Sequence, residues 1–375
     1  MTLTTETVMA QLATVIDPEI HKPITELGMV RSVNIDDGAV TVHIDLTTAG
    51  CPLRDTITAD TKKAVGAVEG VTGVEVVMGV MDDEQKAALK TKLRGGAPEK
   101  ENPFAKPGSL TRVYAISSGK GGVGKSSMTV NLATSMAKAG LKVGIVDADI
   151  YGFSIPNMMG VTTQPQVVDG MIIPPVAHGV KTISIGMFME ENLPVVWRGP
   201  ILHRALEQFF SDVYWGDLDV LLLDLPPGTG DIAMSVAQLI PNSEVVVVTT
   251  PQAAAAEVAE RAGFMAKQTK QRVVGVIENM SYMEMPDGTK VDVFGTGGGS
   301  TVASRLSQIL GYPVPVIAQV PLETAVRAGG DAGVPIAIAD GESPAQREVR
   351  AAAEKLSGRA RGLSGKALGV TPINN

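Results

Sequence analysis

A glycine-rich segment with two lysines is the strongest candidate for chemistry in this sequence. Residues 117–127 read Ser-Ser-Gly-Lys-Gly-Gly-Val-Gly-Lys-Ser-Ser. They contain the pattern G-x-x-x-x-G-K-S, in which backbone N–H groups surround phosphate, the lysine contacts the β- and γ-phosphates and the serine hydroxyl binds Mg²⁺. The segment therefore predicts a site for ATP with Mg²⁺. The expected nucleotide-binding residues of this phosphate loop are Gly119, Lys120, Gly121, Gly122, Val123, Gly124, Lys125, Ser126 and Ser127.

The same glycines also fit a dinucleotide-binding pattern. Three of them match G-x-G-x-x-G, and the acidic Asp147 follows about twenty residues later. This alternative, a dinucleotide-dependent oxidoreductase, leaves Lys125 and Ser126 without a role. A Lys-Ser pair at these two positions therefore favours the triphosphate.

Carboxylates at the ends of two apolar segments complete the predicted site. Asp224 ends the run Asp-Val-Leu-Leu-Leu-Asp, and Asp147 and Asp149 end the run Val-Asp-Ala-Asp. A carboxylate at the tip of a strand beside a phosphate loop typically holds Mg²⁺, so we predict a metal site of Ser126 and Asp224, supported by Asp147. We expect Asp147 and Asp149 to point to the same side, with Asp149 orienting the attacking water. The alternative is an aspartate pair that only stabilises a turn.

Two further features near the loop suggest a nucleotide-dependent switch. Lys120 is a second cation close to Lys125, and the repulsion between them is relieved only if phosphate neutralises both. Lys120 could also reach a partner's nucleotide across a dimer interface, in the manner of an arginine finger. The segment Pro-Pro-Gly-Thr-Gly at 226–230 can change conformation at its glycines and is placed to sense the γ-phosphate. The residues expected to promote hydrolysis are Lys120, Lys125 and Asp149.

Alternating strand and helix patterns position these residues. Continuous apolar strands separated by helices predict an α/β fold with a doubly wound, mostly parallel sheet, whose ligands bind at the carboxyl ends of the strands. The expected strands are 113–117, 143–147, 220–224, 245–249, 273–278 and 314–318. The expected helices are 126–139, 201–214, 252–268 and 300–310. Residues 161–196 interrupt the pattern with short strands and are interpreted as an insertion.

The chain divides into two predicted domains. Residues 96–109 contain three prolines and two glycines without an apolar period, which is typical of a linker. Before it, residues 1–95 predict a small α+β domain in which Asp-Asp-Gly at 36–38 joins two strands of a hairpin. After it, residues 110–356 form the phosphate-loop ATPase domain, and we expect residues 357–375 to be a disordered tail.

Composition limits the remaining possibilities. The 375 residues carry a formal net charge of −8, which argues against a protein that coats nucleic acid or an anionic membrane. A single cysteine excludes an intrachain disulfide and a multi-cysteine metal site built from one chain. The first residues lack the pattern of a signal peptide, and the apolar runs are too short to cross a bilayer. We therefore expect a cytoplasmic protein with no nucleic-acid partner and no stable membrane association.

Together these motifs resemble a known family. The sequences Gly-Lys-Gly-Gly-Val-Gly-Lys-Ser, Asp-Ala-Asp-Ile-Tyr-Gly and Asp-Leu-Pro-Pro-Gly-Thr-Gly-Asp occur in the order seen in the Mrp/ApbC branch of the deviant-Walker ATPases. These relatives of MinD and ParA are described as iron–sulfur cluster carriers or scaffolds. Trp-Arg-Gly-Pro at 197–200 and Glu-Asn-Met-Ser at 278–281 are similar to the same branch, and residues 1–95 resemble a domain of iron–sulfur assembly proteins.

The resemblance implies partners and residue roles. Lys120 resembles the signature lysine that acts in trans, which implies a homodimer with nucleotide between its subunits. Asn279 resembles the asparagine that hydrogen-bonds the purine edge, and a strand-end turn residue is the alternative. The implied partners are apo iron–sulfur client proteins and assembly factors. The implied activity is hydrolysis of ATP coupled to binding and transfer of clusters.

One departure from the family concerns the cluster itself. Members usually carry Cys-Pro-x-Cys after Asn-Met-Ser, but Met285 and Gly288 occupy those positions here, and neither residue supplies a thiolate. Cys51 matches the family's cysteine in the N-terminal domain, before Pro52 at a strand-to-helix turn where a helix N-terminus favours the thiolate. We predict that Cys51 binds a transient iron–sulfur cluster together with a partner's thiol. The alternative for Cys51 is a small buried residue.

Two other functions stay open on the sequence alone. A positioning ATPase of the MinD or ParA kind needs a basic amphipathic tail for a membrane or a basic stripe for DNA. The tail has few basic residues and is interrupted by glycines, which counts against this function. The second is an ATPase of the same family that has lost its own cluster site, which the missing cysteine pair suggests.

Overall fold

The computed structural model describes residues 3–47, 53–93, 101–106, 108–150, 152–188, 199–228, 230–252 and 255–358. Cys51 and residues 359–375, both named in the sequence predictions, lie outside them. The chain forms two compact units. The first comprises Met1–Glu101, Thr163–Val176 and Asp212–Gly216, and the second comprises Asn102–Thr162, Ala177–Ser211 and Asp217–Asn375.

The first unit is a small α+β domain. Its sheet pairs β1 (Val30–Asp36) antiparallel with β2 (Ala39–Leu46), which runs parallel to β3 (Gly73–Val80). Asp37 and Gly38 at the β1–β2 turn have φ of 43° and 87°, a left-handed conformation that suits a tight hairpin. The predicted hairpin is therefore confirmed. The helices are α1 (Thr5–Leu12), α2 (Arg54–Gly66) and α3 (Asp83–Leu93).

A hairpin from the middle of the sequence belongs to this first unit. It consists of β6 (Gln166–Val168) and β7 (Met171–Ile173), which pair antiparallel. Three of its side chains, Val168, Met171 and Ile173, are buried in one hydrophobic cluster with residues of α1 and β2 such as Leu12 and Ile44. The residues predicted as an insertion thus contribute core to the N-terminal domain.

The second unit contains the predicted doubly wound sheet. Its strand order is β15-β12-β11-β4-β10-β5-β9-β8, and the six neighbouring pairs from β15 to β9 are parallel. Parallel strands covered on both faces are apolar throughout, and β5, β9 and β10 are buried at every position. The strands are β4 (Arg112–Ser117), β5 (Val143–Asp147), β8 (Val176–Ala177), β9 (Val180–Ser184), β10 (Val220–Asp224), β11 (Glu244–Thr249), β12 (Arg272–Asn279) and β15 (Val316–Val320).

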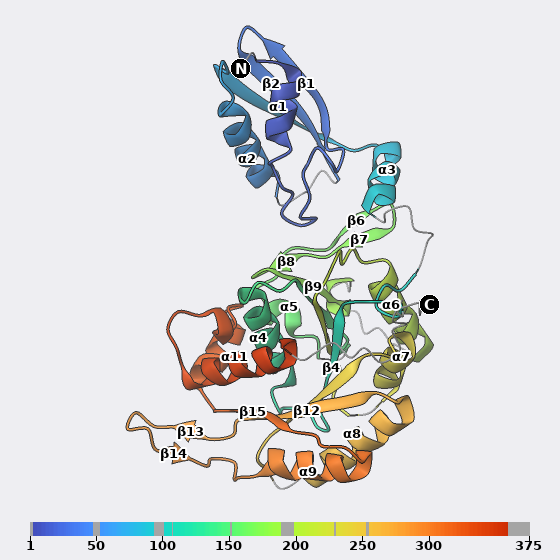
Figure 1. The fold of residues 1–375 in the computed structure, drawn as a ribbon, viewed down its shortest axis with the longest axis vertical. Helices are drawn as coiled ribbons and strands as arrows, with labels where there is room; N and C mark the ends of the chain where they lie inside the picture. The colour runs from blue at the N-terminus through green and yellow to red at the C-terminus, as the bar shows by residue number, and fades with distance from the viewer. Residues whose placement is uncertain are drawn as a thin grey trace, which may run out of the picture. The chain divides into compact units, whose positions relative to one another are not determined.

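Helices lie on both sides of this sheet (Figure 1). On one side, α4 (Lys125–Lys138) and α11 (Pro344–Ser357) share the main hydrophobic cluster with the strands. On the other lie α6 (Gly199–Ser211) and α7 (Asp231–Leu239). The remaining helices are α5 (Ile155–Met158), α8 (Ala255–Thr269), α9 (Gly298–Leu310), α10 (Thr324–Asp331) and the 3₁₀ turns η1 (Ile185–Phe188) and η2 (Ile336–Ile338).

Several elements differ from the sequence prediction. β9, within the predicted insertion, extends the main sheet beside β5. The helices α7 and α11 were not predicted, and β15 begins two residues later than the expected strand. Part of the predicted linker packs on the second unit, because Phe104 is buried with its ring edge-on to Phe210 at 6.2 Å between centroids.

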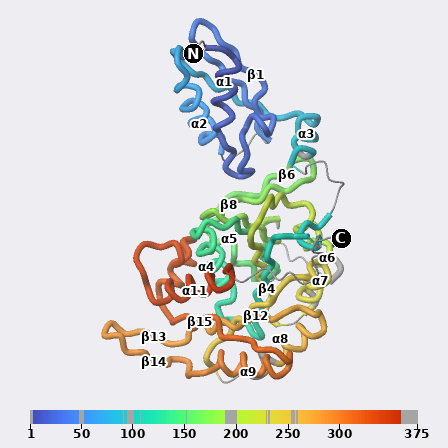
Figure 2. Tube along the Cα trace, in the orientation of Figure 1, coloured from blue at the N-terminus to red at the C-terminus, as the bar shows by residue number. Residues whose placement is uncertain are grey.

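A short hairpin follows β12. Its strands β13 (Met283–Glu284) and β14 (Lys290–Val291) pair antiparallel, and the hairpin extends away from the sheet (Figure 2). No helix among the described residues is long and apolar enough to cross a membrane.

Candidate nucleotide site

The phosphate loop joins the end of β4 to the start of α4. Gly124 caps the helix with a φ of 77°, and Gly122 has a φ of 76°, values that favour glycine. The loop thereby delivers its backbone N–H groups at the N-terminus of a 14-residue helix, whose dipole attracts anions. This is the strand–loop–helix context that the motif predicts.

Asn279 packs directly beneath the loop. Its Nδ2 atom donates a hydrogen bond to the Val123 carbonyl oxygen at 2.9 Å, and the side chain is buried. A Cβ atom at Gly124 would lie 2.2 Å from this same Nδ2 atom, so only glycine fits there. Asn279 therefore shapes the phosphate loop, and its contact with a purine stays a prediction.

Asp224 contacts three side chains from the first two turns of α4. Lys125 Nζ lies 2.6 Å from Oδ2, and Ser126 Oγ donates to the same oxygen at 2.6 Å. Thr129 Oγ1 donates to Oδ1, also at 2.6 Å. Lys125 and Asp224 are both buried, and taking two charges out of water is costly. The hydrogen bonds that Ser126 and Thr129 donate to Asp224 offset part of that cost. The structure thus brings together three of the predicted site residues.

Asp147 has different surroundings from Asp149. Its carboxylate accepts hydrogen bonds from the backbone of Asp149 at 3.1 Å and Ile155 at 3.3 Å, and from Ser184 Oγ at 3.1 Å. Burial, with a smaller contribution from the nearby Asp224 carboxylate, raises the pKa of Asp147 to about 7. Asp147 is thus held by the backbone just after its own strand, by the start of α5 and by β9, and its role as a metal support stays a prediction.

A cavity of about 210 Å³ opens above the phosphate loop. Asp149 lines it and accepts a hydrogen bond from the Gly152 backbone at 3.1 Å. The position is suited to the predicted role in orienting water. The cavity is lined by Ser118, Lys120, Gly121, Gly122, Val123, Gly124, Lys125, Ser126, Ser127, Asp149, Ser154, Met158 and Pro227.

The loop that follows β10 is tied to the phosphate loop. Gly228, with a φ of 93°, donates its backbone N–H to the Ser118 carbonyl oxygen at 2.8 Å. The Ser118 hydroxyl is buried at the cavity and has no hydrogen-bond partner within the described part of the chain. A phosphate oxygen would satisfy that donor, so the cavity fits a phosphorylated ligand.

The donor set also fits Mg²⁺. Ser126 and Asp224 offer adjacent hard oxygen ligands, and Mg²⁺ commonly uses one or two such groups together with water and substrate phosphates. Among the residues that the structure describes, no three His, Cys, Asp or Glu side chains cluster as a metal site. The ion would therefore share its ligands with the nucleotide.

Comparison with known proteins agrees with this geometry. A family model described as NUBPL iron-transfer P-loop NTPase matches residues 109–357. The chain belongs to this family. A second model, described as iron-sulfur cluster assembly protein, matches residues 5–76.

Relatives of this P-loop NTPase match along nearly their full length. An iron-sulfur cluster carrier protein from Mycobacterium tuberculosis is 59% identical over 96% of this chain and 95% of that protein. One from Synechocystis is 40% identical over 95% of this chain and 98% of that protein. A nucleotide-binding protein from Archaeoglobus fulgidus, solved with ADP, is 35% identical over 61% of this chain and 92% of that chain, with a TM-score of 0.51.

The hairpin of β13 and β14 contains Met285 and Gly288, the two positions at which the resemblance in the sequence implies a cysteine pair. Met285 is 43% exposed, and its carbonyl accepts the backbone N–H of Gly288 at 2.9 Å in a tight turn. Lys290 Nζ lies 3.9 Å from the centre of the Tyr282 ring, which braces the base of the hairpin. The segment is an ordered structural hairpin with no thiolate.

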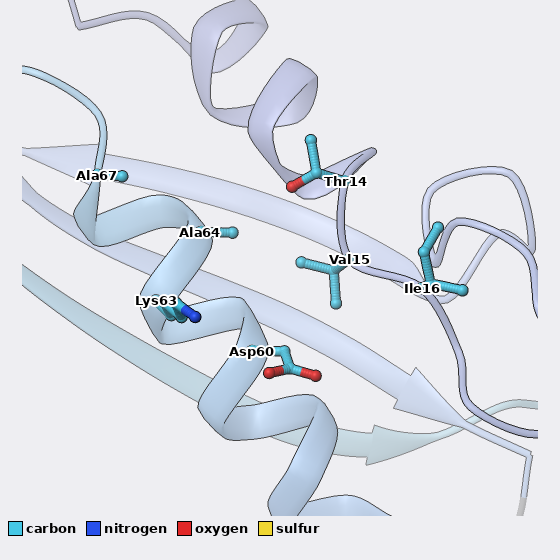
Figure 3. Close-up of a pocket in the computed structure, with 7 residues that line it drawn as sticks. All are labelled: Thr14, Val15, Ile16, Asp60, Lys63, Ala64 and Ala67. Atoms are coloured by element: carbon cyan, nitrogen blue, oxygen red, sulfur yellow. The ribbon is translucent and has the colours of Figure 1, made fainter.

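A second hollow lies in the N-terminal unit (Figure 3). It has a volume of about 480 Å³ and lies between the end of α1 and α2. Within the described part of the chain, Asp60 and Lys63 are its only charged lining residues and no glycine loop lines it, so it does not suit a triphosphate. The lining residues are Thr14, Val15, Ile16, Asp60, Lys63, Ala64 and Ala67.

Three residues near the sites make contacts that the sequence did not predict. Thr129 follows Lys125 by four positions and so shares its helix face. This spacing is a sequence signal that could have placed Thr129 at the site. Glu278 is buried and accepts hydrogen bonds from Ser281, Gln319 and the Gly299 backbone, thereby holding the start of α9. Gln252 contacts Lys120, and nothing in the sequence indicates this pairing.

Proposed function

We propose that this NTPase binds and hydrolyses ATP and carries iron–sulfur clusters to apo-proteins in the cytoplasm, working as a nucleotide-gated homodimer. The observation that carries the proposal is the group formed by the buried Lys125 and Asp224 and the half-buried Ser126 beneath a glycine loop. Relatives named iron-sulfur cluster carrier proteins support the cargo, because one of them is 59% identical over 96% of the chain.

Each residue at the site has a role in hydrolysis. Lys125 would leave Asp224 for the β- and γ-phosphates, since a phosphate carries more negative charge than one carboxylate. Ser126 and Asp224 would then hold Mg²⁺, which supplies charge neutralisation at the phosphates when bound. Asp149 would orient the attacking water, and Lys120 would stabilise the charge that develops on the phosphates.

The cargo requires thiolates from more than one chain. Each chain has a single cysteine, Cys51, whereas a [4Fe–4S] cluster usually has four thiolate ligands. A homodimer therefore offers two, and a client or assembly factor would supply the others. A cluster held by shared ligands exchanges more readily, which suits a carrier.

Anaerobic reconstitution tests the carrier function. The purified full chain is incubated with iron, sulfide and a thiol reductant, desalted, and analysed for iron content and visible absorption. We expect iron retention in the wild type, its loss in Cys51→Ser, and ATP-dependent transfer to an apo-ferredoxin. If the wild type neither retains iron nor transfers a cluster, the proposed carrier function is refuted.

An ATPase without a cluster of its own is the second candidate. The structured hairpin at Met285 and Gly288 favours it, because the usual pair of thiolates is replaced by an ordered turn. In this case the wild type hydrolyses ATP but retains no iron, and Cys51→Ser behaves like the wild type.

A further inference from the structure

Lys120 is held by a residue that lies far away in the sequence. Its Nζ atom donates to Gln252 Oε1 at 2.5 Å, although 132 positions separate the two residues. Lys120 lines the cavity above the phosphate loop, whereas Gln252 follows the end of β11 and is exposed. This contact links the end of the Lys120 side chain, which lines the cavity, to the segment that follows β11.

The backbone that carries Gln252 is firmly packed. A Cβ atom at Gly298 would lie 2.3 Å from the Thr250 carbonyl oxygen and 2.8 Å from Pro251 Cα, so the start of α9 lies against this segment. The next glycine, Gly299, is in turn anchored by its hydrogen bond to the buried Glu278. The backbone just before Gln252 thus lies against the start of α9, and the exposed side chain of Gln252 extends from this segment.

The two lysines of the loop are held by partners of different charge. Lys125 is buried against the carboxylate of Asp224, whereas the partner of Lys120 is a neutral amide. A neutral acceptor orients an ammonium group without neutralising it. A phosphate oxygen, which carries formal negative charge, is the stronger acceptor and can take the lysine away.

We infer that Gln252 is a positioning residue for Lys120. It holds the ammonium at the mouth of the cavity and releases it to nucleotide phosphate, and its neutrality makes the contact reversible. The inference rests on the proposed ATP-binding function and adds a residue to it. It does not depend on whether the phosphate belongs to the same subunit or to a second copy of the chain.

An isosteric change tests this role. Gln252→Glu keeps the shape but turns the contact into an ion pair that competes with phosphate. We expect it to weaken the binding of ATP–Mg²⁺ by roughly 1.5–5-fold, the range for an exposed pair. Gln252→Ala should weaken binding less than Gln252→Glu. A purely structural role predicts the opposite order, since glutamate resembles glutamine more closely than alanine does.

A double-mutant cycle separates the contact from a general charge effect. In a Lys120→Ala background, Gln252→Glu should bind a fluorescent ATP analogue as Lys120→Ala alone does. Gln268→Glu, which adds the same charge on the exposed part of α8, serves as the matched control. The inference fails if Gln252→Glu binds like the wild type, or if its loss persists without Lys120. If the wild type itself does not bind the analogue, the proposed function fails instead.

Discussion

The ammonium nitrogen of Lys125 lies 2.6 Å from a carboxylate oxygen of Asp224, and both side chains are buried. Each group neutralises a charge that would otherwise be costly to bury. The pair also joins the first turn of α4 to the tip of β10, so the residues that we propose for phosphate and for Mg²⁺ are linked. Any ligand that attracts one of them alters the environment of the other.

Thr129 should matter for activity as well as for stability. Thr129→Val removes the hydroxyl that orients the Asp224 carboxylate, and we expect ATP hydrolysis to fall by roughly 3–10-fold and stability by about 1–2 kcal/mol. Steady-state kinetics and urea unfolding measure the two effects. Thr134→Val is the matched control. Thr134 lies on the same helix, and in the described contacts its buried hydroxyl donates only to backbone carbonyls of α4. Equal activity loss in both variants would contradict the role of Thr129.

Gly124 cannot be replaced without strain. Gly124→Ala places a Cβ atom 2.2 Å from Asn279 Nδ2 in a backbone with a φ of 77°. We expect a loss of stability of roughly 2–4 kcal/mol from the clash and the left-handed conformation together. Adding Asn279→Ala should restore part of the lost stability, because it removes the clash but leaves the backbone strain. Denaturant unfolding of the single and double variants measures these changes in the free energy of unfolding. If the losses from the two substitutions simply add, the contact between Gly124 and Asn279 is contradicted.

Stability should fall as the pH rises from about 4 to about 7. The pKa of Asp147 is raised from 3.8 to about 7 by burial and, to a smaller extent, by Asp224. Between these values the folded chain binds a proton that the unfolded chain has lost, so acid favours folding in this window. We expect Asp147→Asn to flatten the dependence by about 1–3 kcal/mol between pH 5 and pH 8. Urea unfolding at both pH values tests it, with the exposed Asp292→Asn as the control that should keep the wild-type slope.

Gln166 should stabilise the N-terminal unit. Its Oε1 accepts from Thr47 Oγ1 at 2.7 Å, and its Nε2 donates to Glu19 Oε2 at 3.1 Å. Since the side chain is buried, Gln166→Ala leaves both partners without this bond and should cost about 1–2 kcal/mol. Val167→Ala, at a neighbouring residue that is 51% exposed, should cost little. Thermal unfolding followed by circular dichroism compares them, and equal melting temperatures would contradict this role.

Local pattern was enough to predict much of the sheet. The apolar runs that end at Asp147 and Asp224 match β5 and β10 at both ends, because continuous burial leaves a clear signal. The phosphate loop was equally readable, since its glycines have to adopt special backbone angles. The family resemblance, with cluster assembly in the N-terminal part, is confirmed by the matching family models.

Other features depend on contacts between distant segments. β9 is a five-residue strand whose place in the sheet depends on pairing with β5, and no local pattern specifies that partner. Likewise, Gln166 contacts Thr47 across 119 positions and Lys120 contacts Gln252 across 132. Hydrogen bonds between polar side chains have no periodic signature, so their partners are known only once the fold is built.

Calorimetric titration of ATP–Mg²⁺ into the wild type and Lys125→Ala tests the central claim most directly. We predict saturable binding to the wild type and at least about a 100-fold weaker affinity in the variant, because one charge-assisted contact to phosphate is lost in a buried site. A melting curve of each protein verifies folding. Absence of binding to folded wild type, or equal affinity in the two proteins, would contradict the account.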